Sequence, residues 1–141
     1  MNSKDFGDIG EAQVLLAFLK KGYHVSIPFD DNSPYDLVVD IEGKLKKVQC
    51  KYASMKENGS IPIYRYSTTR GSNSKKEDDS VFIKNTYNDI DFIAAYCPDT
   101  DKVYLVPLHS FEDKLILTLR ITPPANGVIK GVNFASDYEL K

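Results

Sequence analysis

The sequence lacks the features that mark membrane-spanning, secreted or zinc-binding proteins. No apolar run approaches the ~20 residues that a transmembrane helix needs. The first residues show no signal-peptide pattern. The two cysteines, Cys50 and Cys97, do not have the spacing of a metal motif. We therefore expect a cytoplasmic protein with free thiols and no membrane partner.

Acidic residues are nearly absent between residues 43 and 76. This segment holds nine lysines and arginines against Glu57 alone, a local net charge of +8, whereas the rest of the chain sums to −10. Charge segregation of this kind favours a polyanionic partner, although lysines in turns also serve solubility. The candidates for contact with such a partner are Lys44, Lys46, Lys47, Lys56, Arg65, Tyr66, Arg70, Asn73, Lys75 and Lys76.

With 141 residues, 42% of them apolar, the chain has the size and composition of one globular domain. Apolar spacing predicts a helix over about 3–21 and a short helix from 111, with a last helical turn near 134–138. Residues 67–80 are expected to form a mobile basic loop. Strands are predicted over 23–28, 35–41, 45–53, 61–66, 90–96 and 102–107, and residues 115–121 form a strand or end the short helix. This order predicts an α/β (α+β) fold, a mixed central sheet flanked by helices.

The most informative motif spans two neighbouring predicted strands. Asp36 stands at the head of the first, and Gln49 and Lys51 lie two residues apart on the second. Residues i and i+2 of a strand share a face, so a hairpin would bring Asp36 beside both. Cys50 points to the opposite face and is expected in the core. A carboxylate, an amide oxygen and an ammonium in one small space are the groups that a metal-dependent phosphodiesterase uses.

Each of these residues also has a purely structural interpretation. Glu11 could complete a helix capping box with Asp8. Asp36 could fasten the preceding loop, and Gln49 and Lys51 could be surface residues of a half-exposed strand. Structural roles are favoured for four further polar residues, although His24 could also approach a phosphate: His24, Asp40, Asp91 and His109.

Mg²⁺ fits the catalytic interpretation, and Mn²⁺ is able to substitute for it. Mg²⁺ takes oxygen ligands and keeps several waters, so one or two carboxylates and a carbonyl suffice. Asp36 is the expected central ligand, joined by the Gln49 amide oxygen and the Cys50 backbone carbonyl. Glu11 would bind a second ion or hold a water. Lys51 would orient the attacking water, stabilise charge on the phosphate or act as a base, and the sequence leaves these roles open.

Glu11, Asp36 and Gln49-Cys50-Lys51, in this order and spacing, resemble the PD-(D/E)xK nuclease superfamily. Gly7–Glu11 resembles the opening of its first helix, and Pro34-Tyr35-Asp36 stands where the superfamily has Pro-Asp. The resemblance spans about residues 4–53 and implies a restriction-endonuclease-like core. Gln49 departs from the usual Asp or Glu. A neutral amide ligates metal more weakly than a carboxylate, although some relatives carry glutamine here.

A second resemblance covers nearly the whole chain. Residues 91–107, 119–126 and 135–138 resemble the small homing endonucleases of this superfamily, of the type found in cyanobacterial group I introns. The resemblance implies Mg²⁺-dependent, site-specific cleavage of double-stranded DNA in a bacterium or organelle. It also implies a homo-oligomer, with a tetramer expected and a dimer at minimum.

On this interpretation residues 1–141 form one nuclease domain. The catalytic core covers about 4–106, and residues 107–141 support the fold or the assembly. Residues 64–73 would enter a DNA groove, with Arg65 and Arg70 as guanine readers. Two alternatives stay open, a nuclease resembling Holliday-junction resolvases and a non-catalytic DNA-binding subunit with a degenerate site.

Overall fold

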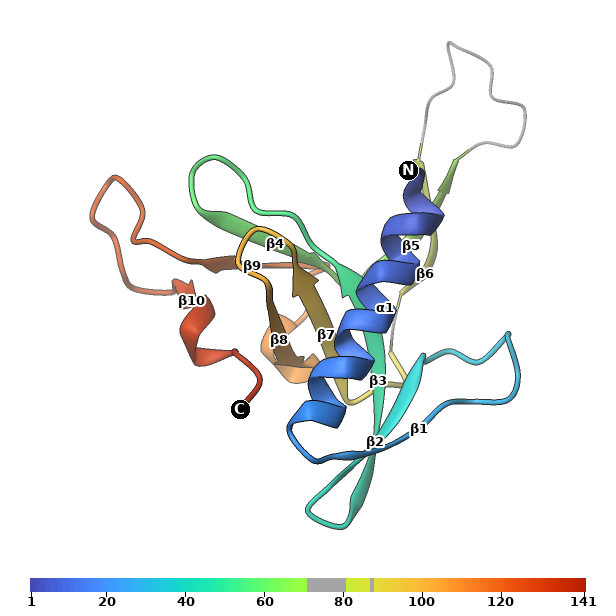
Figure 1. Cartoon of the computed structure of the whole chain (residues 1–141). Coiled ribbons are helices and arrows are strands. Elements are labelled where there is room, and N and C mark those ends of the chain that lie inside the picture. The colour runs from blue at the N-terminus through green and yellow to red at the C-terminus, as the bar shows by residue number, and fades with distance from the viewer. Residues whose placement is uncertain (71–80, 87) are drawn as a thin grey trace.

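The computed structural model describes residues 1–70, 81–86 and 88–141 (Figure 1). Its centre is a five-stranded sheet in the order β1-β2-β3-β7-β8. β3 and β7 pair in parallel and the other neighbours are antiparallel, so the expected mixed sheet is confirmed. The bounds of these strands are β1 His24–Ser26, β2 Leu37–Ile41, β3 Lys44–Tyr52, β7 Phe92–Cys97 and β8 Lys102–Pro107.

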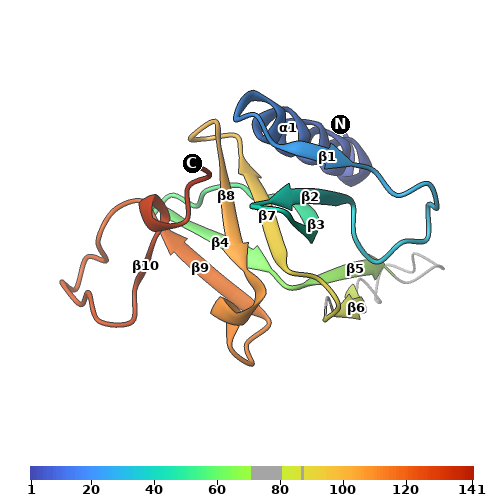
Figure 2. The same cartoon turned by 90° about the horizontal axis from the view of Figure 1, so that it is seen from below.

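The helix α1, Ser3–Lys20, crosses one face of this sheet (Figure 2). The side chain of Asn2 accepts the backbone N–H of Asp5 and the Asp5 carboxylate accepts that of Asn2, so this pair forms the capping box. The capping interpretation of Glu11 is therefore wrong, because Glu11 lies inside the helix. Gly22, with φ of 88°, allows the turn that follows the helix. No helix in the described ranges is long and apolar enough to span a bilayer.

Two apolar clusters lie on the two faces of the sheet. On one face Val14 and Phe18 of α1 pack against Leu37, Val39 and Val48. On the other, a second sheet in the order β10-β9-β4 supplies the covering layer. Its strands are β4 Ser60–Tyr64, β9 Ile116–Arg120 and β10 Asn133–Phe134. A sheet thus covers the face where a further helix was expected.

The basic segment ends in a two-stranded ribbon. β5, Tyr66–Arg70, pairs antiparallel with β6, Val81–Thr86, with an irregularity between Ser67 and Thr68. The expected loop over 67–80 is therefore wrong at its start, because the polar residues 67–70 gain ladder hydrogen bonds from β6, which the sequence pattern did not reveal. Asn73, Lys75 and Lys76 lie outside the described residues.

The C-terminal third differs from the prediction in detail. The short helix is a 3-10 helix, η1, over Leu108–Phe111, and residues 115–121 contain β9 rather than the end of a helix. The final turn is a second 3-10 helix, η2, over Ala135–Asp137. The segment after η2 bonds to β8, through Tyr138 O with Leu105 N and Leu140 N with Val103 O, and so covers that edge of the central sheet.

Candidate active site

Asp36 is the residue at which the candidate site comes together. The β2–β3 register pairs Leu37 with Val48, which brings Asp36 to the edge of β3. Its Oδ2 accepts a hydrogen bond from Nε2 of Gln49 at 2.8 Å and another from the backbone N–H of Cys50 at 2.9 Å. Its own N–H donates to Val48 O at 2.9 Å. The hairpin thus places the carboxylate beside Gln49, as the strand pattern predicts.

Glu11 reaches the same place from the helix. The preceding residue, Gly10, is buried against β3, and a Cβ at this position would lie 3.1 Å from both C and O of Lys51. Because Gly10 has no side chain, α1 runs close to the strand that carries Gln49 and Lys51. Glu11 and Asp36 then line one hollow of about 200 Å³. The sequence contained Gly10 in its motif but gave no sign of this close approach.

Lys51 connects the site to the basic ribbon. Its Nζ donates a hydrogen bond to the backbone carbonyl of Tyr66 at 2.8 Å. Tyr66 is the first residue of β5, and its ring lies edge-on to Tyr64 with the centroids 5.5 Å apart. The ammonium is therefore held between Asp36 and the base of the ribbon. This contact was not visible in the sequence, because a backbone carbonyl carries no sequence signal.

Burial governs the protonation of these groups. It raises the pKa of the Asp36 carboxyl, which the Cys50 N–H bond and the Lys51 charge oppose. Burial, and then the charges of Asp36 and Asp8, raise the pKa of Glu11. Burial lowers the pKa of Lys51 to about 8, against the effect of Asp36. The site therefore holds two acids that are costly to ionise, and a cation beside them would favour their charged forms.

Cys50 has no side-chain role in this cluster. Its thiol is buried in the core under α1. Burial raises the pKa of the thiol most, and the charges of Asp36 and Glu11 raise it further. A thiol with a raised pKa is a poor nucleophile and a poor metal ligand. Only the backbone of Cys50 faces the site, through its N–H on Asp36.

The donors suit Mg²⁺ in kind, since carboxylate, amide and backbone oxygens are hard ligands. In the part of the chain that the structure describes, no three acidic, histidine or cysteine side chains gather as a preformed cage. Gln49 directs its amide nitrogen toward Asp36. Joint ligation of an ion by both residues would therefore require the Gln49 amide to rotate.

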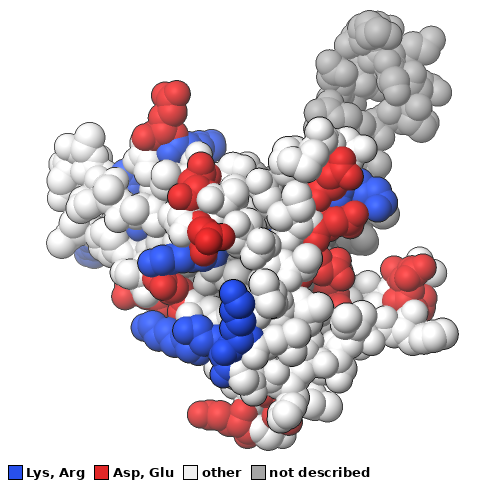
Figure 3. All heavy atoms as spheres, in the orientation of Figure 1, with Lys and Arg blue, Asp and Glu red and all other residues white. Residues whose placement is uncertain are grey.

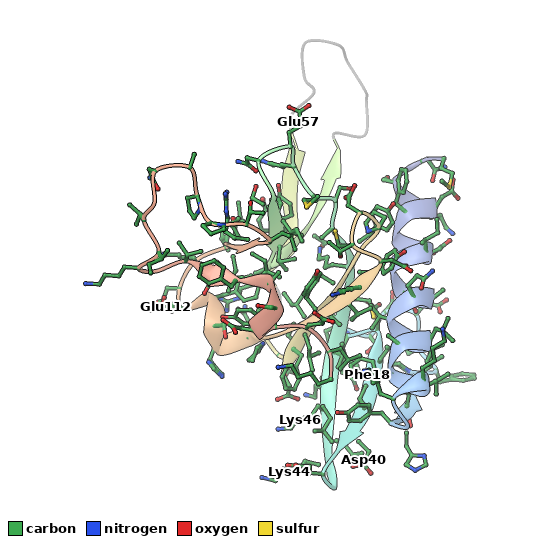
Figure 4. All side chains as sticks on the ribbon, turned by 60° about the vertical axis from the view of Figure 1, so that its left-hand side comes forward. Phe18, Asp40, Lys44, Lys46, Glu57 and Glu112 are labelled. Carbon is green, nitrogen blue, oxygen red and sulfur yellow. The ribbon has the colours of Figure 1, made fainter. Side chains whose placement is uncertain are left out.

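The predicted contact residues do not form one patch. Lys44 and Lys46 lie at the turn end of β3, whereas Glu57, the neighbour of Lys56, lies at the opposite end of the molecule (Figure 4). On the face seen in Figure 1, basic and acidic side chains are interspersed (Figure 3). The part of the +8 segment that the structure describes is thus continuous in sequence but divided in space.

Two of the predicted contact residues already have partners within the protein. Lys47 Nζ lies 3.0 Å from the Asp89 carboxylate and 5.7 Å from the centre of the Tyr35 ring. Arg65 donates to Asn88 Oδ1 at 2.8 Å and to the Glu112 carbonyl at 3.4 Å. These contacts fasten the chain around the base of the β5–β6 ribbon, so DNA would have to compete for both cations.

The acidic residues expected to be structural do have such contacts. Asp91 Oδ2 accepts the backbone N–H of Lys47 at 2.9 Å. Asp40 Oδ1 accepts that of Gly43 at 2.9 Å in the β2–β3 turn. His24 opens β1 and His109 lies in η1, both away from Asp36 in the fold.

Comparison with known proteins agrees with this geometry. A protein-family model described as PD-(D/E)XK endonuclease matches residues 1–141. The solved structure of a bacterial homing endonuclease, I-Ssp6803I, matches with a TM-score of 0.68 and 24% identity, covering 99% of this chain and 89% of that one. No curated protein sequence matches significantly. The structural likeness establishes the restriction-endonuclease-like fold.

Proposed function

The chain belongs to the PD-(D/E)XK endonuclease family, and on that premise we propose that it is a Mg²⁺-dependent DNA endonuclease of the homing type. It would hydrolyse phosphodiester bonds in both strands of double-stranded DNA at a specific site. The observation that carries the proposal is the Asp36 carboxylate, which is bonded to Gln49 and Cys50 and shares a hollow with Glu11. Lys51 lies on the strand that holds two of these groups.

Asp36 and Glu11 would hold the ion, with the Gln49 amide oxygen and the Cys50 carbonyl as further ligands. When bound, a divalent ion polarises the phosphate and lowers the pKa of water. Lys51 keeps its proton on Nζ and presents it toward the scissile phosphate, where negative charge grows. The Tyr66 carbonyl limits the positions that Nζ can take, because it accepts one of the three ammonium hydrogens.

Cutting both strands requires two copies of the site, so the proposal includes a homo-oligomer of at least two chains, with four expected. A two-fold assembly would favour a pseudo-palindromic target. Residues 107–141 are the proposed support for assembly, and the proposed location is wherever DNA is accessible, in a bacterial cytoplasm or an organelle. Mn²⁺ is expected to replace Mg²⁺ in the reaction.

The direct test is incubation of the protein with Mg²⁺ and a plasmid library, followed by sequencing of the cut ends. We expect ends that share one long sequence, and no ends in EDTA. Random nicking, or no cutting, would contradict the homing proposal. A four-way junction offered beside a linear duplex separates a resolvase-like activity, which prefers the junction, from the proposed one. Binding without cutting in Mg²⁺ and Mn²⁺ would indicate the non-catalytic alternative.

A further inference from the structure

The loop between β1 and β2 exposes an unusual apolar tip beside the candidate site. Phe29 is 105% exposed and Ile27 61% exposed. Large apolar side chains in a loop are normally turned inward, because exposing them to water is unfavourable. Ile27 and Pro28 line the same hollow as Glu11 and Asp36, so the residues directly before Phe29 belong to the wall of the site.

The loop has a defined shape. Asp30 accepts the N–H of Asn32 on its side chain at 2.9 Å and that of Ser33 on its backbone carbonyl at 3.4 Å. Such contacts fix a turn immediately after Phe29. The turn therefore fixes the backbone next to Phe29, whose ring is exposed to solvent.

The charges of this loop exclude one kind of contact. No lysine or arginine occurs between Lys21 and Lys44, and the loop carries Asp30 and Asp31, both exposed. Figure 3 shows acidic and no basic atoms on this projection, which lies at the right in the orientation of Figure 1. Phosphates are bound by cations and N–H donors, so an acidic loop is a poor phosphate contact. Its aromatic and apolar side chains suit base edges and base faces.

The position of the loop indicates which part of a bound DNA it would contact. In Figures 1 and 2 the loop and the β5–β6 ribbon project on the same side of the molecule, and Asp36 ends the loop at the start of β2. A phosphate bound at Asp36 would lie in the hollow that Ile27 and Pro28 also line, so the DNA on either side of it would pass close to this loop. Phe29 directly follows these two residues, and its exposed ring would be available to that DNA.

We propose that the loop is a DNA-reading arm and that Phe29 inserts as an apolar wedge at a base step beside the cut. This inference rests on the proposed function. Insertion of such a side chain partly unstacks the two neighbouring base pairs. The protein would then bind more tightly to DNA sequences in which this base step deforms easily. The two projections would divide their tasks. The basic ribbon contacts the backbone, and the loop reads bases or their deformability.

The chain contains no tryptophan, so Phe29→Trp introduces a single tryptophan at the tip, which can be excited selectively over the tyrosines. The matched control is Ile129→Trp, because Ile129 is also exposed, at 65%, and lies in the distant segment between β9 and β10. Each variant is titrated with a fluorescein-labelled duplex of about 30 random base pairs in EDTA, where no cutting occurs. Tryptophan emission reports stacking, and fluorescein anisotropy reports binding independently.

We expect the emission of Phe29→Trp to fall by roughly half or more as anisotropy rises, and that of Ile129→Trp to change little. Phe29→Ala should weaken duplex binding about tenfold, and its binding should keep the same dependence on salt, since no phosphate contact is lost. Unchanged Phe29→Trp emission on bound DNA would overturn the wedge while leaving the proposed function intact. Absence of any anisotropy change would overturn both. A change of emission with protein concentration alone would assign the tip to contact between copies instead.

Discussion

The two ends of β3 carry similar residues with different surroundings. At the amino end, Asp40 pairs with Leu45, and Lys44 and Lys46 flank that position; at the carboxyl end, the same register brings Asp36 beside Gln49, with Lys51 two residues further on. Asp40 fastens a turn and Lys44 is exposed to solvent. At the other end, α1 and the start of β5 close over the strand. Similar residue types are therefore present at both ends, but only at the carboxyl end do α1 and β5 enclose them.

The largest contrast is expected from the lysines. Lys51→Ala removes the one ammonium held beside Asp36 and should lower the cleavage rate by about 10²–10³-fold or more, as for loss of a group that stabilises transition-state charge. Lys46→Ala, at the other end of the same strand, should change cleavage no more than about threefold. The measurement is plasmid linearisation in Mg²⁺. Duplex binding in EDTA should persist in both variants, and cutting by Lys51→Ala at the normal rate would refute the site assignment.

Adding a carboxylate should also separate the two ends. Gln49→Glu replaces an amide that donates to Asp36 by an anion, so the metal-free protein should lose stability and Mg²⁺ affinity should rise about tenfold, because carboxylate ligands carry charge. Leu45→Glu places the same group opposite Asp40, where Leu45 is 70% exposed. Calorimetric titration with Mg²⁺ should detect no added affinity there. Equal gains in both variants would show that the affinity comes from net charge and not from the site.

The contrast between the two ends of β3 also shows which parts of this site the sequence could predict. Alternation along residues 45–53 placed Gln49 and Lys51 on one face and Cys50 on the other, and the structure agrees. Side-chain pattern could not reveal the Tyr66 carbonyl on Lys51, because every residue has a carbonyl. The pattern also could not show that the basic residues lie far apart in space. Local charge density does not reveal that the nine-residue strand β3 places its two ends on different parts of the molecule.

The same reasoning holds for the fold. The bounds of β7 and β8 were predicted to within two residues, because buried strands have continuous apolar runs in the sequence. The β5–β6 ribbon was missed, since polar residues 67–70 carry no period and gain their order by pairing with a strand more than ten residues away. Long-range pairing of this kind has no local signature.

Removing the charge of the acid at each end of β3 should affect stability differently at the two ends. Burial raises the pKa of Asp36, so the folded state resists its ionisation and holds protons that the unfolded state releases. Metal-free stability should accordingly fall as the pH rises from 3.8, the ordinary pKa of an aspartate carboxyl, through the raised pKa. Asp36→Asn should remove this loss and stabilise the metal-free protein by about 1 kcal/mol at neutral pH. Thermal melting in EDTA measures the effect.

Asp40→Asn is the control for this charge effect. Its amide oxygen can still accept the Gly43 N–H, so the stability should stay within about 0.5 kcal/mol of the parent. If Asp36→Asn melts at a lower temperature than the parent in EDTA, the two hydrogen bonds that the Asp36 carboxylate accepts outweigh the cost of burying its charge. Asp36 would then stabilise the metal-free protein. Adding Mg²⁺ should raise the melting temperature of the parent and not that of Asp36→Asn.

The smallest contrast tests how closely α1 must approach the end of β3 that carries Gln49 and Lys51. A Cβ at Gly10 would lie 3.1 Å from Lys51 C and O, whereas one at Gly7 of the same helix meets nothing within 4 Å. Gly7→Ala should therefore gain about 0.5–1 kcal/mol of helix propensity. Gly10→Ala has the same gain but must move the helix away from β3, at a cost of about 1–3 kcal/mol, so it should be destabilised overall. Because the shift also carries Glu11 away from Asp36, Gly10→Ala should lose cleavage activity even at temperatures where melting shows it to be fully folded. Normal activity in folded Gly10→Ala would mean that the position of Glu11 does not matter.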